Sequence, residues 1–331
     1  MRAVEFETFG EPGDVLKVVS RESPRPAPGH VVVRLRARAI NPSDLFTVRG
    51  KYGVLPQLPA TPGLEGVGEV TQVGSQVTGL SLGDRVVTLG PIVTGTPGTW
   101  AEEMSGEAAS WVKVPASVPD EVAAQFLINP VTAWAMIHDI VALPPGSWVM
   151  QTGAASAVGR AVIAFARAAG HKTLNVVHRV ERVAELNALG ADVTLCTEED
   201  DVLARVREVT EGKGVPLALE SVGGRSLNDC IQSLSVGGTV VLYGLVGALK
   251  SNVELSPLLF GANAVRGFWL TRYLRALTVE RRQEVATKVM NLLSERRLVP
   301  GVEATYDLAQ VGDACRHAEA EGRRGKVLLV G

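Results

Sequence analysis

The first third of the chain consists of short runs in which apolar and polar residues alternate or β-branched residues cluster. Examples are HVVVRLRARAI (30–40), VGEVTQVGSQV (67–77) and GDRVVTL (83–89), with glycine and proline between them. Short strands at close spacing with turn residues between them are typical of an antiparallel, barrel-like domain. The pattern therefore predicts a β-rich domain up to about residue 121.

From residue 122 onward, strand and helix patterns alternate. SWVMQTG (147–153) has the pattern of a buried strand, and AVGRAVIAFARAAG (157–170) that of a helix ending at Gly170. Further pairs follow as far as RGFWL (266–270), which could close the sheet. Strands that alternate with helices of about 10–15 residues predict an α/β domain with a doubly wound parallel sheet. An amphipathic helix is predicted over 278–298, and KVLLVG (326–331) is a strand whose domain the pattern leaves open.

Composition and charge place the chain among ordinary globular proteins. It has 331 residues, 46% hydrophobic and 21% charged, with a net charge of −2 and scattered lysines and arginines. This argues against nucleic acid or a membrane surface as a partner. Three widely spaced cysteines favour a reducing compartment, and polar residues within VAAQFLINPVTAWAMIH (122–138) favour a buried helix over a membrane span. The N-terminal MRAVEFETFG resembles a first strand rather than a targeting segment, so a cytoplasmic location is predicted.

The segment QTGAASAVGRAV (151–162) joins a predicted strand to a predicted helix through small residues. Such a turn binds a dinucleotide pyrophosphate at the positive end of the helix. The usual G-x-G-x-x-G pattern falls on Ala154, Ser156 and Gly159, so only the third glycine is present. Any tight strand–helix turn could have this composition, but a second strand about 20 residues later favours nucleotide binding.

The second strand of this unit ends in NVVHRVER (175–182). NAD enzymes place an acidic residue at this end, whereas here His178, Arg179 and Arg182 occur and the first acid is Glu181. A carboxylate would repel a 2′-phosphate and a guanidinium would bind it. NADPH is therefore favoured over NADH, unless these cations only solvate the start of a helix.

The histidines and cysteines show no spacing typical of metal ligands, so no metal site is predicted. Without a Lewis acid, hydride addition to a C=C bond conjugated to a carbonyl is favoured over reduction of a plain ketone.

The segment AINPSDLFTVRGKYG (39–53) has a structural explanation of its own. Asn41 suits an N-cap, Pro42 the first helical position, and Asp44 the positive end of a short helix that Gly50 ends. Tyr52 follows, and an aromatic residue near a turn is usually a packing residue. The residues alone favour a packing role for Tyr52 over a catalytic one.

Five motifs follow one another over nearly the whole chain: INPSDLFTVRGKYGVLPQLPA (40–60), GTWAEE (98–103), LINPVTAWAMI (127–137), ESVGG (220–224) and RGFWL (266–270). Together they resemble the zinc-free medium-chain dehydrogenase/reductases, and more narrowly the mitochondrial-type 2-enoyl thioester reductases. Quinone oxidoreductases are neighbouring relatives. Zinc ligands of other relatives would fall at Asn41 and Leu64, which cannot bind zinc.

The resemblance implies two domains and a homodimer joined along sheet edges. Residues 1–121 and 297–331 would form a GroES-like catalytic domain that includes the C-terminal strand. Residues 122–296 would form the Rossmann dinucleotide-binding domain.

The resemblance also implies site residues. Tyr52 matches a proton-donating tyrosine, and the cofactor-binding positions are Asn129, Ala155, Ser156, Ala157, Val158, Gly159, His178, Arg179, Tyr243, Gly244, Leu245, Val246, Phe268, Trp269, Leu270, Thr271 and Lys326. His178, where the family often has arginine, and the alanine-rich turn depart from its pattern. Trp269 could equally be a core residue.

The implied activity is NADPH-dependent reduction of a trans-2-enoyl thioester, carried by coenzyme A or an acyl carrier protein. Hydride would add to Cβ. Phenols have a pKa near 10 and keep their proton at pH 7, so Tyr52 would donate the proton or hydrogen-bond the thioester oxygen. The alternatives are an NADPH:quinone oxidoreductase and a non-catalytic NADPH-binding protein. Acyl chain length depends on loops such as GPIVTGTPGTW (90–100).

Overall fold

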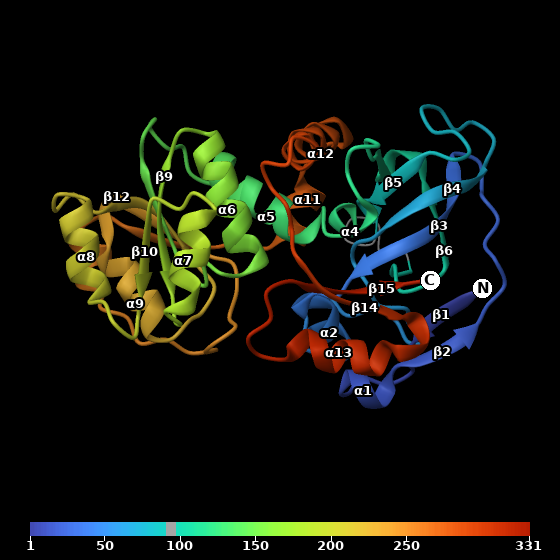
Figure 1. Ribbon diagram of the computed structural model, residues 1–331, viewed down its shortest axis with the longest axis horizontal. Helices are drawn as coiled ribbons and strands as arrows, with labels where there is room; N and C mark the ends of the chain where they lie inside the picture. The colour runs from blue at the N-terminus through green and yellow to red at the C-terminus, as the bar shows by residue number, and fades with distance from the viewer. Residues whose placement is uncertain (91–96) are drawn as a thin grey trace. The chain divides into compact units, whose positions relative to one another are not determined.

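The computed structural model describes residues 1–90 and 97–331, which form two compact units (Figure 1). The first comprises Met1–Val131 and Leu274–Gly331, and the second Thr132–Tyr273. The domain boundaries expected at 121/122 and 296/297 stay predictions. Residues just after 121 contact the first unit, where Glu65 accepts bonds from the amides of Leu127 and Ile128, and Gln283 donates to the carbonyl of Ala109. Residues 91–96 of the segment 90–100 lie outside the described part.

The strands of the first unit are β1 (Arg2–Glu5), β2 (Lys17–Ser20), β3 (His30–Ala39), β4 (Val67–Val73), β5 (Arg85–Thr88), β6 (Glu103–Glu107), β7 (Trp111–Lys113), β14 (Val302–Asp307) and β15 (Lys326–Val330). β1 and β2 pair with each other, and the larger sheet has the order β14-β15-β3-β4-β5-β7, with β6 paired to β3. All pairs are antiparallel except β14–β15. The β-rich first domain and the return of the C-terminal strand to it are confirmed.

The helices described in this unit are α1 (Pro12–Val15), α2 (Pro42–Val48), η1 (Ala108–Ser110), α4 (Asp120–Ala123), α12 (Val279–Ser294), η2 (Leu308–Gln310) and α13 (Val311–Glu319). α12 confirms the amphipathic helix, although it ends before residue 298 because the chain turns at Arg296 with a positive φ of 55°. α13 packs on β15 and α1.

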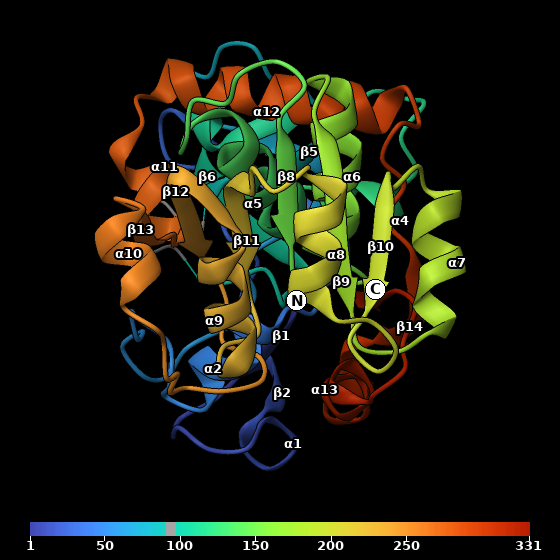
Figure 2. The same cartoon turned by 90° about the vertical axis from the view of Figure 1, so that its left-hand side faces the viewer.

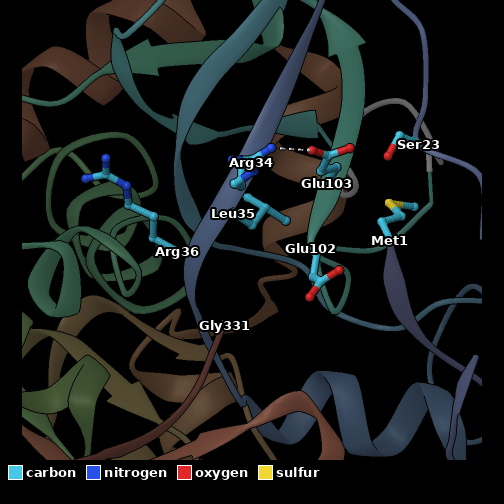
Figure 3. Close-up of a pocket in the computed structure, with 8 residues that line it drawn as sticks. All are labelled: Met1, Ser23, Arg34, Leu35, Arg36, Glu102, Glu103 and Gly331. Carbon is cyan, nitrogen blue, oxygen red and sulfur yellow. Dashed lines mark hydrogen bonds and ion pairs between the residues drawn. The ribbon is translucent and has the colours of Figure 1, made fainter. Parts of the chain in front are cut away.

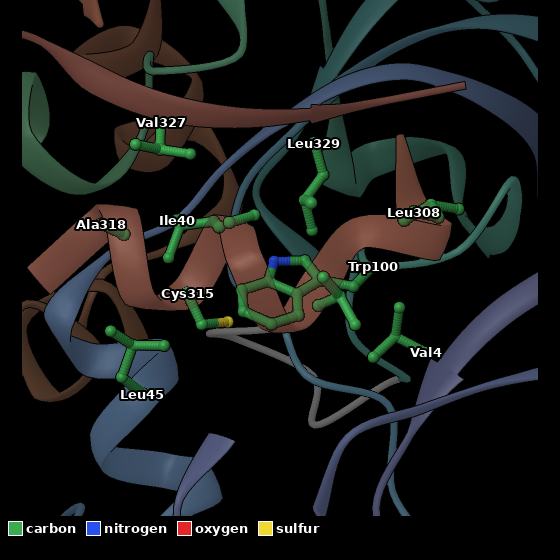
Figure 4. Close-up of a cluster of buried hydrophobic side chains, with 11 residues drawn as sticks. Val4, Ile40, Leu45, Trp100, Leu308, Cys315, Ala318, Val327 and Leu329 are labelled. Atoms are coloured by element: carbon green, nitrogen blue, oxygen red, sulfur yellow. The ribbon is translucent and has the colours of Figure 1, made fainter. Parts of the chain in front are cut away.

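A buried apolar cluster surrounds Trp100 in the first unit (Figure 4). Ile40 from the end of β3, Val327 and Leu329 from β15, and Leu45 from α2 belong to it. Burial of each such side chain contributes about 1.5–3 kcal/mol. The cluster therefore holds the backbone firmly on either side of the β3–α2 junction and at the start of β15.

The second unit contains the strands β8 (Trp148–Gln151), β9 (Lys172–Val177), β10 (Val193–Cys196), β11 (Val215–Glu220), β12 (Leu234–Leu242) and β13 (Ala264–Gly267). Their order is β10-β9-β8-β11-β12-β13 and every pair is parallel. The parallel sheet predicted from the sequence is confirmed. β13 closes one edge, and it shares Arg266 and Gly267 with the segment 266–270 that was expected to do so.

Its helices are α6 (Ala157–Ala168), α7 (Glu181–Ala188), α8 (Val202–Val209), α9 (Arg225–Gln232) and α10 (Ser256–Phe260). α5 (Ile128–His138) and α11 (Leu270–Ala276) run across the two limits of the unit. One apolar cluster joins α8 and α9 to the sheet and another joins α6 and α7. Figures 1 and 2 show these two helix pairs on opposite faces, as a doubly wound sheet requires. No described helix is long and apolar enough to cross a membrane.

Candidate active site

The turn between β8 and α6 presents backbone amides at the start of a helix. Ser156 is the N-cap: its Oγ accepts from the Gly159 amide at 3.1 Å, and its carbonyl accepts the first helical bond, from Arg160, at 3.0 Å. The amides of Ala157 and Val158 precede that first helical bond, so the helix itself leaves them without an acceptor. The turn thus offers two N–H groups and a positive helix end to an anion.

Gly159 permits the close packing of α6 on this turn. A Cβ at this position would lie 2.3 Å from the carbonyl oxygen of Ala154, a backbone atom that cannot move aside cheaply. Earlier in the turn, Gly153 has a φ of +58°, a left-handed conformation that suits glycine. Of the three glycines of the G-x-G-x-x-G pattern, this chain therefore keeps the third, at Gly159. Gly153 lies at the bend between β8 and α6.

Four groups of expected cofactor residues follow the carboxyl ends of β8, β9, β12 and β13. In the sheet, β9 lies next to β8 and β12 next to β13, with β11 between the two pairs. Carboxyl ends of parallel strands share one edge, where α/β sheets bind ligands. His178 is exposed there, with Nδ1 3.2 Å from Thr197 Oγ1 and Nε2 3.7 Å from a Glu198 carboxylate oxygen. Arg182 instead pairs with Glu185 at 2.9 Å within α7.

Positions 243–246 and 268–271 differ in exposure. Leu245 and Val246 are exposed, whereas Leu270 and Thr271 are buried at the start of α11. Trp269 is half-buried, which fits neither a fully buried core residue nor a freely exposed one.

The hydroxyl of Tyr243 is buried and has no hydrogen-bond partner within the described part of the chain. Its polar neighbours are Ser221 and Ser156, the latter from the phosphate turn. Burial raises the pKa of Tyr243 to about 12, so the phenol keeps its proton. An unpaired buried donor costs about 1–3 kcal/mol, and a bound nucleotide could supply its acceptor.

A buried carboxylate that the sequence analysis did not single out supports this edge. Glu220, the last residue of β11, accepts from Thr152 Oγ1 at 3.0 Å, Ser226 Oγ at 2.8 Å and the Gly223 amide at 2.7 Å. These bonds fasten the 221–224 loop to the residue preceding Gly153. An acidic residue ending the apolar run VPLALE (215–220) was the signal that could have found it.

In the first unit, a buried polar network surrounds Asn41. Lys326 Nζ donates to Asn41 Oδ1 at 2.5 Å, and Asn41 Nδ2 donates to Glu65 Oε1 at 2.7 Å. The other oxygen of Glu65 accepts from the amides of Leu127 and Ile128, both at 2.9 Å. Glu65 therefore satisfies amides at the start of α5, and the sequence analysis missed it.

Two further residues complete this network. Asn129 Nδ2 donates to Asn41 Oδ1 at 3.3 Å, and the Asn41 amide donates to Asp44 Oδ2 at 2.8 Å in a capping box at the start of α2. The predicted N-cap at Asn41 and the first-turn role of Asp44 are confirmed. Tyr52 lies half-buried in the same unit, just beyond the end of α2.

Burial governs the ionisation of this network. It lowers the pKa of Lys326 to about 8, raises that of Asp44 to about 7 and raises that of Glu65. The Lys326 ammonium acts in the opposite direction on both acids, favouring their charged forms. Near neutral pH the network therefore contains one cation, Lys326, near two carboxyl groups. Burial disfavours the charged forms of both carboxyl groups.

The resemblance places the zinc-ligand positions of other relatives at Asn41 and Leu64. Leu64 has no donor atom, and both ends of the Asn41 amide are hydrogen-bonded. Among residues 1–90 and 97–331, no group of three or more His, Cys, Asp and Glu side chains is placed to hold a metal ion. Zinc independence itself stays a prediction.

A surface depression on the first unit, lined by several charged side chains, holds none of the expected site residues (Figure 3). Met1, Ser23, Arg34, Leu35, Arg36, Glu102, Glu103 and Gly331 line it. Arg34 and Glu103 form an ion pair across it at 3.2 Å. Its charges are thus paired, and nothing links it to the residues above.

Comparison with known proteins identifies both parts of the chain. Residues 27–116 match the alcohol dehydrogenase GroES-like domain, and residues 157–295 match the zinc-binding dehydrogenase family. A Rattus norvegicus protein named mitochondrial enoyl-[acyl-carrier-protein] reductase is 36% identical over 90% of this chain and 80% of its own length. One of the same name from Xenopus tropicalis is 34% identical over 99% and 95%.

Solved structures agree with these matches. A putative NADPH:quinone reductase from Bacillus thuringiensis is 29% identical, with a TM-score of 0.92 over 100% of this chain and 98% of that one. Quinone oxidoreductase from Escherichia coli, solved with NADPH, is 25% identical, with a TM-score of 0.87 and full coverage of both chains. The expected GroES-like and Rossmann domains are confirmed. The chain is an oxidoreductase that belongs to the medium-chain dehydrogenase/reductase family and is related to mitochondrial enoyl-[acyl-carrier-protein] reductases.

Proposed function

We propose that this protein reduces the C=C bond of a trans-2-enoyl thioester with NADPH and without zinc. The observation that carries the proposal is the similarity, along 90–99% of the chain, to relatives named enoyl-[acyl-carrier-protein] reductase. The amide of Asn41 and the apolar Leu64 at the zinc-ligand positions agree with the zinc-free chemistry. The thioester is carried by coenzyme A or by an acyl carrier protein.

The residues of the second unit suit a dinucleotide. The N–H groups of Ala157 and Val158 would bind the pyrophosphate, and the Tyr243 hydroxyl would find its missing acceptor there. Bound NADPH supplies the hydride. A solved relative in complex with NADPH supports this choice of cofactor.

The end of β9 favours the phosphorylated form of the dinucleotide. Val177 is the last residue of β9, and His178 and Arg179 follow it where NAD enzymes place an acid. The guanidinium of Arg179 would bind the 2′-phosphate. His178 lies beside Arg179, and the Glu198 carboxylate, 3.7 Å from its Nε2, would partly offset the attraction of this end for a phosphate.

Tyr52 is the proposed acid. When a hydride adds to Cβ, the electron pair of the C=C bond moves to give an enolate at Cα and the thioester oxygen. The phenol of Tyr52 donates its proton to Cα, or hydrogen-bonds the oxygen while water supplies that proton. The products are the saturated thioester and NADP⁺, and a phenolate formed at Tyr52 regains a proton from water.

Quinone reduction is the second candidate, because solved relatives carry that name. A quinone takes up the same hydride, and solvent can protonate its oxygens without a positioned acid.

Steady-state kinetics with a short trans-2-enoyl-CoA and with a simple benzoquinone separate these candidates. For the thioester, Tyr52→Phe is expected to lower kcat about 10²-fold while NADPH affinity is retained, since general acid catalysis contributes about 10²–10⁴-fold. Tyr306→Phe is the matched control, because Tyr306 bonds His317 elsewhere in the same unit. Turnover of the quinone alone, with no effect of Tyr52→Phe, would contradict the proposal.

We also place the protein in the cytoplasm. All three cysteines are free and buried, which suits a reducing compartment. The relatives from Rattus norvegicus and Xenopus tropicalis are named mitochondrial, so microscopy of the tagged protein in its host is the test.

A further inference from the structure

The side-chain amide of Asn41 lies between two opposite charges. The Lys326 ammonium contacts its oxygen at 2.5 Å, and the Glu65 carboxylate contacts its nitrogen at 2.7 Å. All three side chains are buried, Lys326 at 9% exposure and the other two at 1%. Charge-assisted hydrogen bonds of this length are about twice as strong as neutral ones.

This arrangement allows only one orientation of the amide. After a flip, the NH₂ group would face the ammonium and the oxygen would face the carboxylate, so both contacts would become repulsive. Burial magnifies these interactions because the interior has a lower effective dielectric constant than water. The charges of Lys326 and Glu65 therefore determine which atom of Asn41 points to each neighbour.

The main chain brings these residues together. The Ile40 amide donates to the Val327 carbonyl at 3.0 Å, extending the antiparallel pairing of β3 and β15 by one step. The next residue after Ile40 is Asn41, and the residue before Val327 is Lys326. Ile40 and Val327 both belong to the buried Trp100 cluster (Figure 4), so packing holds the two side chains within reach.

The oriented amide acts on two helices. Its oxygen accepts from Asn129 Nδ2, and its nitrogen holds Glu65, whose second oxygen bonds the Leu127 and Ile128 amides at the start of α5. Asn41 is also the N-cap of α2, the helix that leads to Tyr52. One amide thus ties the segment bearing the proposed acid to the expected cofactor residue Asn129.

We propose that Lys326 is a positioning residue: it fixes the orientation of the Asn41 amide and through it places Asn129, rather than binding the cofactor directly. This inference rests on the proposed function, because Asn129 is expected to contact NADPH. It differs from the direct cofactor contact that family resemblance assigns to Lys326. A buried Nζ at 2.5 Å from Asn41 supports the indirect role.

A double-mutant cycle on NADPH affinity, followed by cofactor fluorescence, tests the proposal. Lys326→Met is expected to weaken NADPH binding about tenfold in the wild-type background. In an Asn41→Leu background the same change is expected to have little further effect, because the amide it orients is gone. A direct contact would instead give the same tenfold loss in both backgrounds, and that result would overturn the proposal.

Two further variants keep the test decisive. Lys326→Gln retains an N–H donor, so it is expected to recover part of the affinity lost in Lys326→Met; recovery of none would count against positioning. Lys326→Gln also tests the positioning role if Asn41→Leu does not fold. Lys113→Met is the control, since Lys113 pairs with Asp84 at 2.8 Å on the surface of the same unit, and it should leave affinity unchanged.

The two proposals can fail separately. NADPH binding that shows the predicted coupling, without turnover of any enoyl thioester, would refute the proposed reaction and leave the positioning role standing. Turnover of an enoyl thioester, with additive effects of Lys326→Met and Asn41→Leu on NADPH affinity, would support the proposed reaction and refute the positioning role.

Discussion

Asp44 shows how a buried acid makes stability depend on pH. Its Oδ2 accepts the Asn41 amide, and its Oδ1 has no partner among the described residues. Burial raises the pKa of Asp44 from its ordinary value of 3.8 to about 7. Between these values the folded state holds a proton that the unfolded state releases, so the contribution of Asp44 to stability falls as pH rises.

We therefore predict that Asp44→Asn is more stable than the wild type above pH 7 and similar to it near pH 4. Asparagine can still accept the Asn41 amide, and it carries no charge to desolvate. The gain is at most a few kcal/mol, since one pKa unit corresponds to about 1.4 kcal/mol. Urea unfolding at pH 4, 6 and 8 measures the free energy of unfolding of both proteins. A difference between them that does not change with pH would contradict the explanation.

Tyr243→Phe tests the unpaired hydroxyl beside the phosphate turn. Without the cofactor, removal of a buried donor that has no acceptor is expected to leave the free energy of unfolding unchanged or slightly higher. NADPH affinity is expected to fall about tenfold. A hydrogen bond to a charged group contributes about 1.5–3 kcal/mol, and the variant would lose one. Calorimetric titration measures the affinities for NADPH and for NADH. An unchanged NADPH affinity would show that the hydroxyl does not contact the nucleotide.

The helices and strands were largely predictable because their signals are local. The Asn41–Pro42 start of α2, the Ser156 cap of α6 and the alternation along β3 each follow from neighbouring residues. Helix ends were less predictable, as α12 shows by ending at Ser294. The positive φ at Arg296 that turns the chain carries no glycine signal.

Gly159→Ala is predicted to disrupt the junction of β8 with α6. The new methyl group would meet the Ala154 carbonyl at 2.3 Å, so the helix must shift away from the turn. Overpacking of this kind costs about 1–3 kcal/mol, and NADPH binding should weaken with it. Gly267→Ala is the control in chemical denaturation, because a methyl group there has no neighbour within 4 Å. Equal stability of the two variants would contradict the packing role.

The polar network around Asn41 was much less predictable than the turn. Lys326 and Asn41 meet through a long-range strand pairing, and Glu65 reaches α5 from a loop distant in sequence. No spacing rule connects these positions. An acid within the apolar run TPGLEGVGEV (61–70) was a signal for Glu65, but its partners required the folded chain.

We propose that a second copy of the chain covers the edge of the parallel sheet, as the resemblance implies. Among the described strands, β13 pairs with β12 alone, and Figure 2 shows it at the sheet edge beside α10. Val265 on this strand and Phe260, at 82% exposure, present apolar surface there. Exposed edge strands pair readily with other chains.

Val265→Lys is predicted to convert a dimer into a monomer. Light scattering during gel filtration should give twice the chain mass of 35.0 kDa for the wild type and about the chain mass for the variant. Leu82→Lys, an equally drastic change at an exposed position of the first unit, should leave the dimer intact. A monomeric wild type would refute the proposed dimer.

The most direct test of the proposed function is the product of a single reaction. The purified protein would be incubated with a short trans-2-enoyl-CoA and NADPH in D₂O, and the thioester analysed by mass spectrometry. We predict a saturated acyl-CoA formed in equal amount to the NADP⁺, with one deuterium from solvent at Cα and the unlabelled hydride at Cβ. Recovery of unreacted enoyl-CoA, while a quinone consumes NADPH in the same preparation, would contradict enoyl thioester reduction.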